Sequence, residues 1–181
     1  MDVNGDGIVD VNDKTELGDP HPDVTMGLNL GFDYKGFDFL VTGYAALGQQ
    51  VARSWRKFTD GQYENYTTEV YDYWHGEGTS NKYPILRAGD NTNWQVSDLY
   101  IVDGSYLRLK NISLGYTLPR SLTRQISIER LRFFIMAENL VTWTKYWGFD
   151  PEISSGGKSL GIDKGVYPQA RTWTIGLNLT F

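Results

Sequence analysis

The sequence predicts an all-β fold whose antiparallel strands form a segment of an outer-membrane β-barrel. Apolar and polar residues alternate through five stretches of strand length, and the segments between these stretches are alternately short and long. The chain also ends on an alternating aromatic strand, whose last residue is Phe181. A period of two marks a strand with two different faces. Tight turns at one rim and long loops at the other are typical of membrane barrels.

The composition excludes several other classes of protein. The net charge of -5, with Lys and Arg scattered along the 181 residues, argues against a nucleic-acid surface. The absence of Cys excludes a disulfide framework and a thiolate metal site. No apolar run reaches the length of about 18 residues that a membrane-spanning helix needs, whereas a transmembrane strand needs only about ten alternating residues.

The first two strands are predicted over residues 24–34 and 37–47. In the first, every even-numbered residue is apolar, and the odd positions hold Thr, Gly, Asn or Asp. The alternation resumes directly after Lys35-Gly36, so the pair is predicted to form a tight hairpin. The apolar residues are Val24, Met26, Leu28, Leu30, Phe32 and Tyr34 in the first strand and Phe37, Phe39, Val41, Ala45 and Leu47 in the second.

A long loop, residues 48–104, is predicted next, because clusters of Gly, Asp and Asn replace the alternation there. Within it, residues 66–74 have their aromatic residues at helical spacing. A third strand is predicted over residues 105–118, where the apolar residues are odd-numbered at first and even-numbered afterwards. Such a change of phase predicts a β-bulge near Lys110-Asn111.

The last two strands are predicted over residues 130–143 and 170–181. A turn, residues 119–130, leads into the first of them, and a Gly-rich loop, residues 144–169, leads into the second. The final strand keeps its apolar residues at alternate positions to the end of the chain, and these residues are Trp173, Ile175, Leu177, Leu179 and Phe181.

The N-terminal segment, residues 1–19, is predicted to hold a structural calcium ion. Residues 2–13 match the 12-residue loop of EF-hands and dockerins, in which oxygen atoms at fixed positions converge on a hard cation. At the last position Asp13 replaces the usual Glu, which shortens the reach of that ligand. An acidic, Gly-rich surface turn is the simpler alternative. The expected ligands are Asp2, Asn4, Asp6, the carbonyl of Ile8, Asp10 and Asp13, with Gly7 at the turn.

Aromatic residues in the two long loops are candidate contacts for a ligand or a partner. Exposed rings near Asn and Asp stack on sugars or anchor proteins, but packing within the loops or an interfacial aromatic girdle explains them equally well. Catalysis is not expected, because His21 and His75 lie far apart in loop sequence and Glu138 reads as a charge that faces a barrel lumen. The candidate contact residues are Trp74, Tyr83, Trp94, Tyr146 and Trp147.

Two other classes of protein fit part of the pattern. A secreted, calcium-stabilised β-sandwich that binds carbohydrate would also have two-faced strands. An EF-hand-like docking module needs helices and a second loop that the sequence does not show. The chain starts Met1-Asp2 without an export signal, so a barrel protein that contains it is expected to be longer. Alone, the segment is expected to aggregate through its sheet edges and its apolar face.

Four stretches of the sequence, in the order in which they occur, carry a family resemblance. They are Asp2-Val3-Asn4-Gly5-Asp6-Gly7 running on to Gly18-Asp19-Pro20, then Tyr34-Lys35-Gly36-Phe37-Asp38-Phe39, then Gly104-Ser105-Tyr106-Leu107-Arg108-Leu109-Lys110-Asn111 with Leu114-Gly115-Tyr116, and the terminal aromatic strand. With them the chain resembles the C-terminal part of the SusC/RagA family, the TonB-linked outer-membrane transporters of Bacteroidetes.

The resemblance implies a barrel of about 22 strands that holds an N-terminal plug in the cell outer membrane. It further implies import of oligosaccharides or peptides with a SusD-like surface lipoprotein and with energy from TonB, which would act through a region outside this chain. The five strands would be the last of the barrel, with the calcium loop and both long loops outside the cell. Lipid would meet the apolar faces, and Phe181 would belong to the signal that the barrel-assembly machinery reads. No reaction and no nucleic-acid binding are implied.

Overall fold

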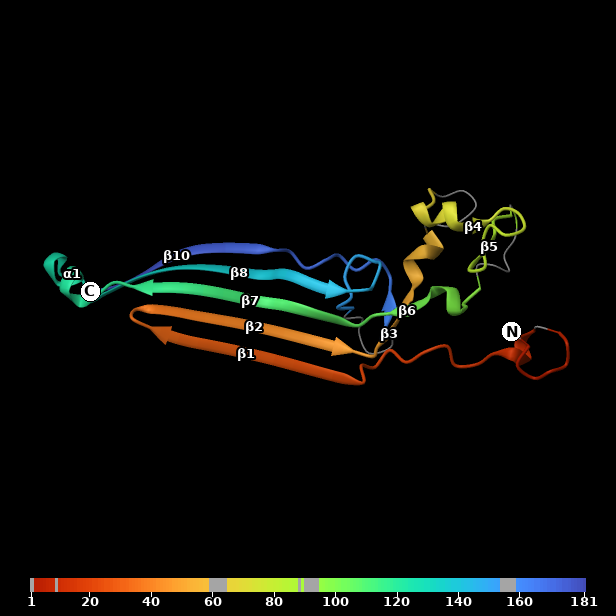
Figure 1. The fold of residues 1–181 in the computed structure, drawn as a ribbon, viewed down its shortest axis with the longest axis horizontal. Coiled ribbons are helices and arrows are strands. Elements are labelled where there is room, and N and C mark those ends of the chain that lie inside the picture. The colour runs from red at the N-terminus through yellow and green to blue at the C-terminus, as the bar shows by residue number, and fades with distance from the viewer. Residues whose placement is uncertain (1, 9, 59–64, 88, 90–94, 154–158) are drawn as a thin grey trace.

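The long strands of the chain form one extended main sheet, and the long loops, which contain two small sheets, gather at one end of it (Figure 1). The computed structural model describes residues 2–8, 10–58, 65–87, 89, 95–153 and 159–181. Five antiparallel strands form the sheet in the order β1-β2-β7-β8-β10. These strands are β1 (Val24–Tyr34), β2 (Phe37–Leu47), β7 (Tyr106–Thr117), β8 (Arg130–Thr144) and β10 (Thr172–Thr180).

The alternation of the sequence located these strands closely. β1 and β2 have the expected bounds, whereas β7 and β10 are shorter at both ends and β8 is one residue longer. At the start of β7 the backbone N–H of Ser105 donates to the carboxylate of Asp103 rather than to a neighbouring strand. Before β10 the carbonyl of Ala170 accepts from the side chain of Asn139. Polar side chains thus form hydrogen bonds with backbone groups that would otherwise pair with a neighbouring strand.

One face of the sheet is apolar from edge to edge, because the register aligns the apolar phase of all five strands. Leu30 pairs with Val41, Val41 with Ile112, and Ile112 with Ala137. Ala137 in turn pairs with Trp173 of the edge strand β10. The β1 side chains on this face are 48–62% exposed, so nothing in the described residues covers them.

The opposite face is polar, and an ion pair that spans three strands crosses it. Arg132 of β8 donates to the two carboxylate oxygens of Asp38 in β2, at 2.8 and 2.5 Å. Gly115 of the intervening strand β7 leaves the necessary room, because a Cβ atom there would overlap both the guanidinium and the carboxylate. The bidentate pair therefore fixes the relative positions of β2 and β8.

The predicted bulge is present at Lys110. The neighbouring residues Thr42 and Gly43 of β2 pair with Asn111 and Leu109, so that Lys110 is an extra residue in β7. In the pairing of β7 with β8, two residues of β8 lie opposite Lys110. Because the extra residue shifts the side-chain phase by one, both halves of β7 keep their apolar residues on the same face.

The two ends of the sheet carry different connections. The β1–β2 turn consists of Lys35 and Gly36, with φ angles of 47° and 88°, as two-residue hairpin turns require. The segment between β7 and β8 was expected to be a turn over residues 119–130, but it contains α1 (Arg120–Thr123) and a 3-10 helix, η6 (Arg124–Ile126). These connections and the C-terminus lie at one end of the sheet, opposite the long loops and the N-terminus (Figure 1).

The long loops contain short elements that the sequence did not reveal. Residues 66–74, expected to be helix-like, form only the 3-10 helix η3 (Thr68–Asp72) followed by a short strand, because β-branched and aromatic residues propagate a helix poorly. β9 pairs in parallel with β3, which joins the two long loops. The remaining elements are η1 (Val11–Asp13), β3 (Gln50–Arg53), η2 (Ser54–Phe58), β4 (Tyr73–Trp74), β5 (Tyr83–Ile85), η5 (Asp98–Tyr100), β6 (Ile101–Asp103) and β9 (Ile162–Asp163).

β1 and β10 form the two edges of the main sheet. Within the described ranges, neither has a partner on its outer side, and each therefore presents a row of backbone donors and acceptors to any strand placed beside it. Among the described residues, no helix has both the length and the apolar character needed to cross a membrane.

Deletion of Lys110 is expected to disrupt the sheet, while Lys110→Thr is not. The deletion removes the phase change in β7, so that one half of the strand must turn its apolar residues to the polar face. Backbone amides of β7 and β8 should then lose their protection from hydrogen exchange, whereas the Lys110→Thr variant, which keeps the residue count, should retain it. Equal protection in both variants would show that the bulge does not set the register.

Candidate functional site

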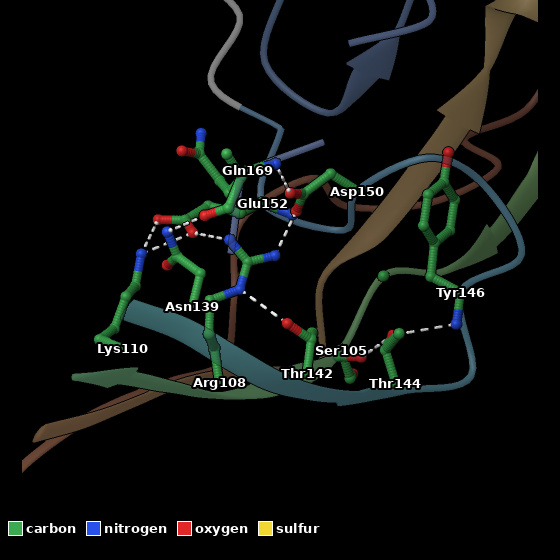
Figure 2. A network of polar contacts seen from close by, with 12 residues as sticks. Ser105, Arg108, Lys110, Asn139, Thr142, Thr144, Tyr146, Asp150, Glu152 and Gln169 are labelled. Atoms are coloured by element: carbon green, nitrogen blue, oxygen red, sulfur yellow. Dashed lines mark hydrogen bonds and ion pairs between the residues drawn. The ribbon is translucent and has the colours of Figure 1, made fainter. Parts of the chain in front are cut away.

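A densely bonded polar cluster lies on the polar face, at the end that carries the long loops (Figure 2). At its centre is Arg108 of β7, whose side chain is 3% exposed. The guanidinium donates to Asp150 at 2.5 Å and to Glu152 at 2.7 Å, and its Nε donates to Thr142 of β8 at 2.9 Å. Because both carboxylates belong to the loop over residues 144–169, this cluster attaches the loop to the sheet.

Lys110, the bulge residue, adds a second cation to the cluster. Its Nζ donates to both carboxylate oxygens of Glu152, at 2.7 and 2.6 Å. The carboxylate of Asp150 also accepts the backbone N–H groups of Glu152 at 2.9 Å and Gln169 at 3.0 Å. Two distant parts of the loop therefore meet at one buried carboxylate. Removing one partner of a buried ion pair typically costs about 3–5 kcal/mol, because the other charge is left uncompensated.

A second set of contacts joins this loop to the loop over residues 48–104. Within the 144–169 loop the Tyr146 hydroxyl donates to the fully buried carboxylate of Asp163, which belongs to β9, and β9 pairs with β3 of the other loop. Burial raises the pKa of Tyr146, and the neighbouring Asp163 carboxylate raises it further, so that the phenol stays protonated. Trp55 lies with its ring centroid 6.0 Å from the centroids of both Trp147 and Phe149.

A buried ionic cluster forms the interior of the 48–104 loop. Arg53 and Arg56, with side chains 3% and 1% exposed, pair with Glu69 at 3.3 and 2.5 Å. The hydroxyl of Tyr83 donates to the same carboxylate at 2.9 Å, and Arg56 donates to the hydroxyl of Tyr73 at 3.1 Å. The two tyrosine rings stack with their centroids 5.1 Å apart. Within the described part of this loop, charged groups and tyrosine rings thus occupy much of the buried interior.

Four of the five candidate contact residues lie in the described part of the chain, and their surroundings differ. Tyr83 and Tyr146 are only 7% and 6% exposed, so their rings pack inside the loops, as one alternative from the sequence had it. Trp74 and Trp147 are 37% and 49% exposed and are accessible to a partner. Trp94 lies outside the described residues.

The acidic N-terminal loop is organised by bonds from its own backbone. Asp2 accepts from the N–H groups of Gly5 at 2.7 Å and Gly7 at 2.8 Å, and these two glycines have φ angles of 78° and 81°. Asp10 caps η1 and accepts the N–H of Asn12 at 2.7 Å. The other expected ligands behave similarly: Asn4 accepts from Asp6, Asp6 from Ile8, and Asp13 from Val3, Asn4 and Asp10.

These bonds favour the ionised form of two of the loop carboxylates, those of Asp2 and Asp13. The backbone N–H of Gly7, followed by that of Gly5, lowers the pKa of Asp2, and the N–H groups of Asp10 and Val3 lower the pKa of Asp13. Among the described residues, no group of three or more His, Cys, Asp or Glu side chains is close enough together to hold a metal ion. The negative charges expected of a cation site are thus present, but their side chains are not gathered into one.

Sequence reasoning did not single out the cluster around Arg108. The available signal was the bulge, which sets two basic residues, Arg108 and Lys110, beside a change of phase. Their partners could not be identified, because Asp150 lies 42 positions along the chain from Arg108 and reaches it only through a folded loop.

Comparisons with curated proteins point to one kind of membrane receptor. No family model matches the chain. It is 33% identical to TonB-dependent receptor P3 of Formosa agariphila, over 99% of the chain and 18% of that receptor. It is 32% identical to the TonB-dependent receptor SusC of Bacteroides thetaiotaomicron, over 100% of the chain and 17% of that receptor. The chain thus spans less than a fifth of the length of these relatives.

Solved structures agree with these sequence relatives. The RagAB peptide importer in its open-open state matches with a TM-score of 0.74 and 31% identity, over 88% of this chain and 17% of that chain. The closed-closed state matches with a TM-score of 0.72 and 29% identity, over 90% and 18%. Because the likeness in sequence and in fold extends over nearly all of its residues, the chain belongs to the SusC/RagA family of TonB-dependent receptors.

Proposed function

We propose that the chain is the C-terminal part of the barrel wall of an outer-membrane transporter that imports oligosaccharides or peptides. Its five strands would be the last of about 22, and the chain would act as wall and loops rather than as an enzyme. Relatives named as TonB-dependent receptors, and the similarity to a protein named as a peptide importer, support this class of function.

One observation carries the proposal, namely the apolar face that crosses five paired strands without a covering layer in the described residues. β1 and β2 have 11 residues each, which fits the roughly 9–11 residues of a tilted strand that crosses a bilayer. In water such a face would drive aggregation, whereas in a bilayer it would lie against lipid tails and would not be exposed to water. The polar face would then line the lumen.

Aromatic residues at both ends of the apolar face support a transmembrane placement. Rings of this kind gather at the two membrane–water interfaces of barrels. Near the long loops Trp143 is 54% exposed, and Phe181, at the opposite end, is 84% exposed. Beside the short turns, adjacent strands contribute the row Tyr34, Phe37, Tyr116 and Phe133. The short turns would face the periplasm, where the barrel-assembly machinery would read Phe181.

The partners follow from this orientation. The long loops would meet a SusD-like surface lipoprotein on the outer side, for which the exposed ring of Trp74 in the 48–104 loop offers an apolar contact. TonB would engage a region of the whole receptor that this chain does not contain.

A soluble β-sandwich that binds carbohydrate is not favoured, because a sandwich needs a second sheet on the apolar face, and the small sheets in the described loops do not supply one.

We also propose that the N-terminal loop binds calcium as a structural ion. Its support is the ionised state of Asp2 and Asp13 and the left-handed backbone of Gly5 and Gly7, which brings residues 2–8 around a sharp turn. Carboxylate oxygens that accept one N–H keep lone pairs for a cation. The lowered pKa values mean that these bonds stabilise the loop above pH about 4 and are lost as the pH falls through the folded-state pKa.

The membrane placement predicts opposite outcomes for two neighbouring substitutions in the whole receptor. Leu30→Arg puts a charge on the apolar face near the middle of β1 and should cost roughly 2–4 kcal/mol in the bilayer. Asn29→Arg puts the same side chain on the polar face and should be tolerated. The amount of heat-modifiable, folded receptor in isolated outer membranes measures both effects. Equal yields of the two variants would contradict the assignment of the faces.

Calcium binding can be measured by calorimetry on the purified receptor. Asp2→Ala and Asp6→Ala are each expected to abolish the binding of one calcium ion, because each removes a carboxylate from the loop. Glu16→Ala, an exposed carboxylate just outside the 12-residue loop, should leave it unchanged. Identical isotherms for all four proteins would remove calcium from the proposal.

A further inference from the structure

The loop over residues 144–169 does not extend freely beyond the sheet. Its carboxylates reach Arg108, which pairs with Tyr44 on one side and Thr142 on the other, all within the polar phase of the sheet. In Figure 2, Asp150 and Glu152 lie directly over β7 and β8 on that side. If the polar face lines a barrel lumen, these residues lie inside the mouth of the barrel rather than above it.

We propose that residues 146–153 and 159–169, here the mouth segment, form a wall inside the outer mouth of the barrel, and that Arg108 is the positioning residue that holds the wall in place. The proposal rests on the barrel function proposed above and goes further, because it assigns to one loop the control of the size of cargo that enters.

The bonding of Arg108 explains why the mouth segment stays attached. The side chains of Arg108 and Asp150 are 3% and 4% exposed, so water does not compete for their ion pair. Besides Arg108, Asp150 accepts two backbone N–H groups, those of Glu152 and Gln169, so the two sides of the segment converge on it. A carboxylate bound in this way cannot leave unless a buried guanidinium loses its counter-charge.

The bulge at Lys110 also supports the attachment of the mouth segment to the polar face. A regular strand would direct Lys110 and Ile112 to the same face, but the extra residue sends Ile112 to the apolar face while Lys110 bonds to Glu152. Bulges re-aim side chains where a strand has a task besides pairing. Here the bulge adds Lys110 to the polar face beside Arg108, and both cations bind the mouth segment.

A third tether fixes the other side of the segment. Ile162 and Asp163 pair in parallel with Ala52 and Arg53 of β3, and Tyr146 donates to the buried Asp163 carboxylate. The mouth segment is therefore held at Asp150, at Glu152 and at β9, which makes it a fixed wall and not a loop that yields to passing cargo. Its position should set an upper limit on the size of molecules that pass.

Cysteine accessibility in the full-length receptor on intact cells tests this placement, since this chain has no cysteine of its own. Ile153→Cys reports on the mouth segment, and Tyr71→Cys, at a residue 81% exposed in the other loop, reports on the outer surface. The probes are a small biotin maleimide and a polyethylene-glycol maleimide of several kilodaltons. Tyr71→Cys should react with both probes, and Ile153→Cys only with the small one.

Releasing the tether should then admit the large probe. In an Asp150→Asn, Glu152→Gln background the labelling of Ile153→Cys by the large probe should rise roughly tenfold or more, while a Glu77→Gln background, which neutralises an exposed carboxylate elsewhere, should leave it unchanged. Heat-modifiable migration of each variant confirms a folded barrel. Such selectivity for probe size would not follow from a general loss of stability.

Two outcomes would overturn the proposal while leaving the barrel function intact. The first is rapid reaction of Ile153→Cys with the large probe in the otherwise unaltered receptor, which would place the segment outside the mouth. The second is no change in that reaction after both carboxylates are neutralised, which would remove Arg108 as the positioning residue. If Tyr71→Cys is not labelled on intact cells at all, the proposed orientation in the membrane fails as well.

Discussion

The register between neighbouring strands is the constraint on which the other features of this chain depend. Side chains alternate between faces with a period of two, so a slip of one residue in any strand would exchange the apolar and polar faces at that strand. Two features resist such a slip. The Arg132–Asp38 ion pair crosses β7 where Gly115 leaves space, and the hairpin turn at Lys35-Gly36 fixes the first ladder.

The bulge at Lys110 connects this register to the loops. One extra residue lets β7 keep its apolar residues on a single face along its whole length, and the same residue places a second cation beside Arg108. The same bulge thus keeps the face proposed to meet lipid apolar along β7 and helps to anchor the 144–169 loop. Contacts between the loops continue the arrangement, because β3 and β9 pair and Trp55 lies beside Trp147.

Most of the sheet could be predicted from the sequence, because the alternation is local and each strand carries it independently. The change of parity between Leu109 and Ile112 was sufficient to locate the bulge. The loop cluster could not be predicted, since Arg108 and Asp150 lie far apart in the chain and only the folded loop brings them together. For the same reason the sequence could identify the aromatic loop residues but could not separate the buried Tyr83 and Tyr146 from the exposed Trp147.

The central claim is that one face of this sheet meets lipid and the other lines a lumen. Spin labels placed one at a time at residues 24–34 of the whole receptor in lipid bilayers test it most directly. Collision with oxygen, which concentrates in lipid, should be high at even-numbered positions and low at odd-numbered ones, and a water-soluble nickel complex should show the reverse. An accessibility to oxygen that does not alternate along β1 would contradict the claim.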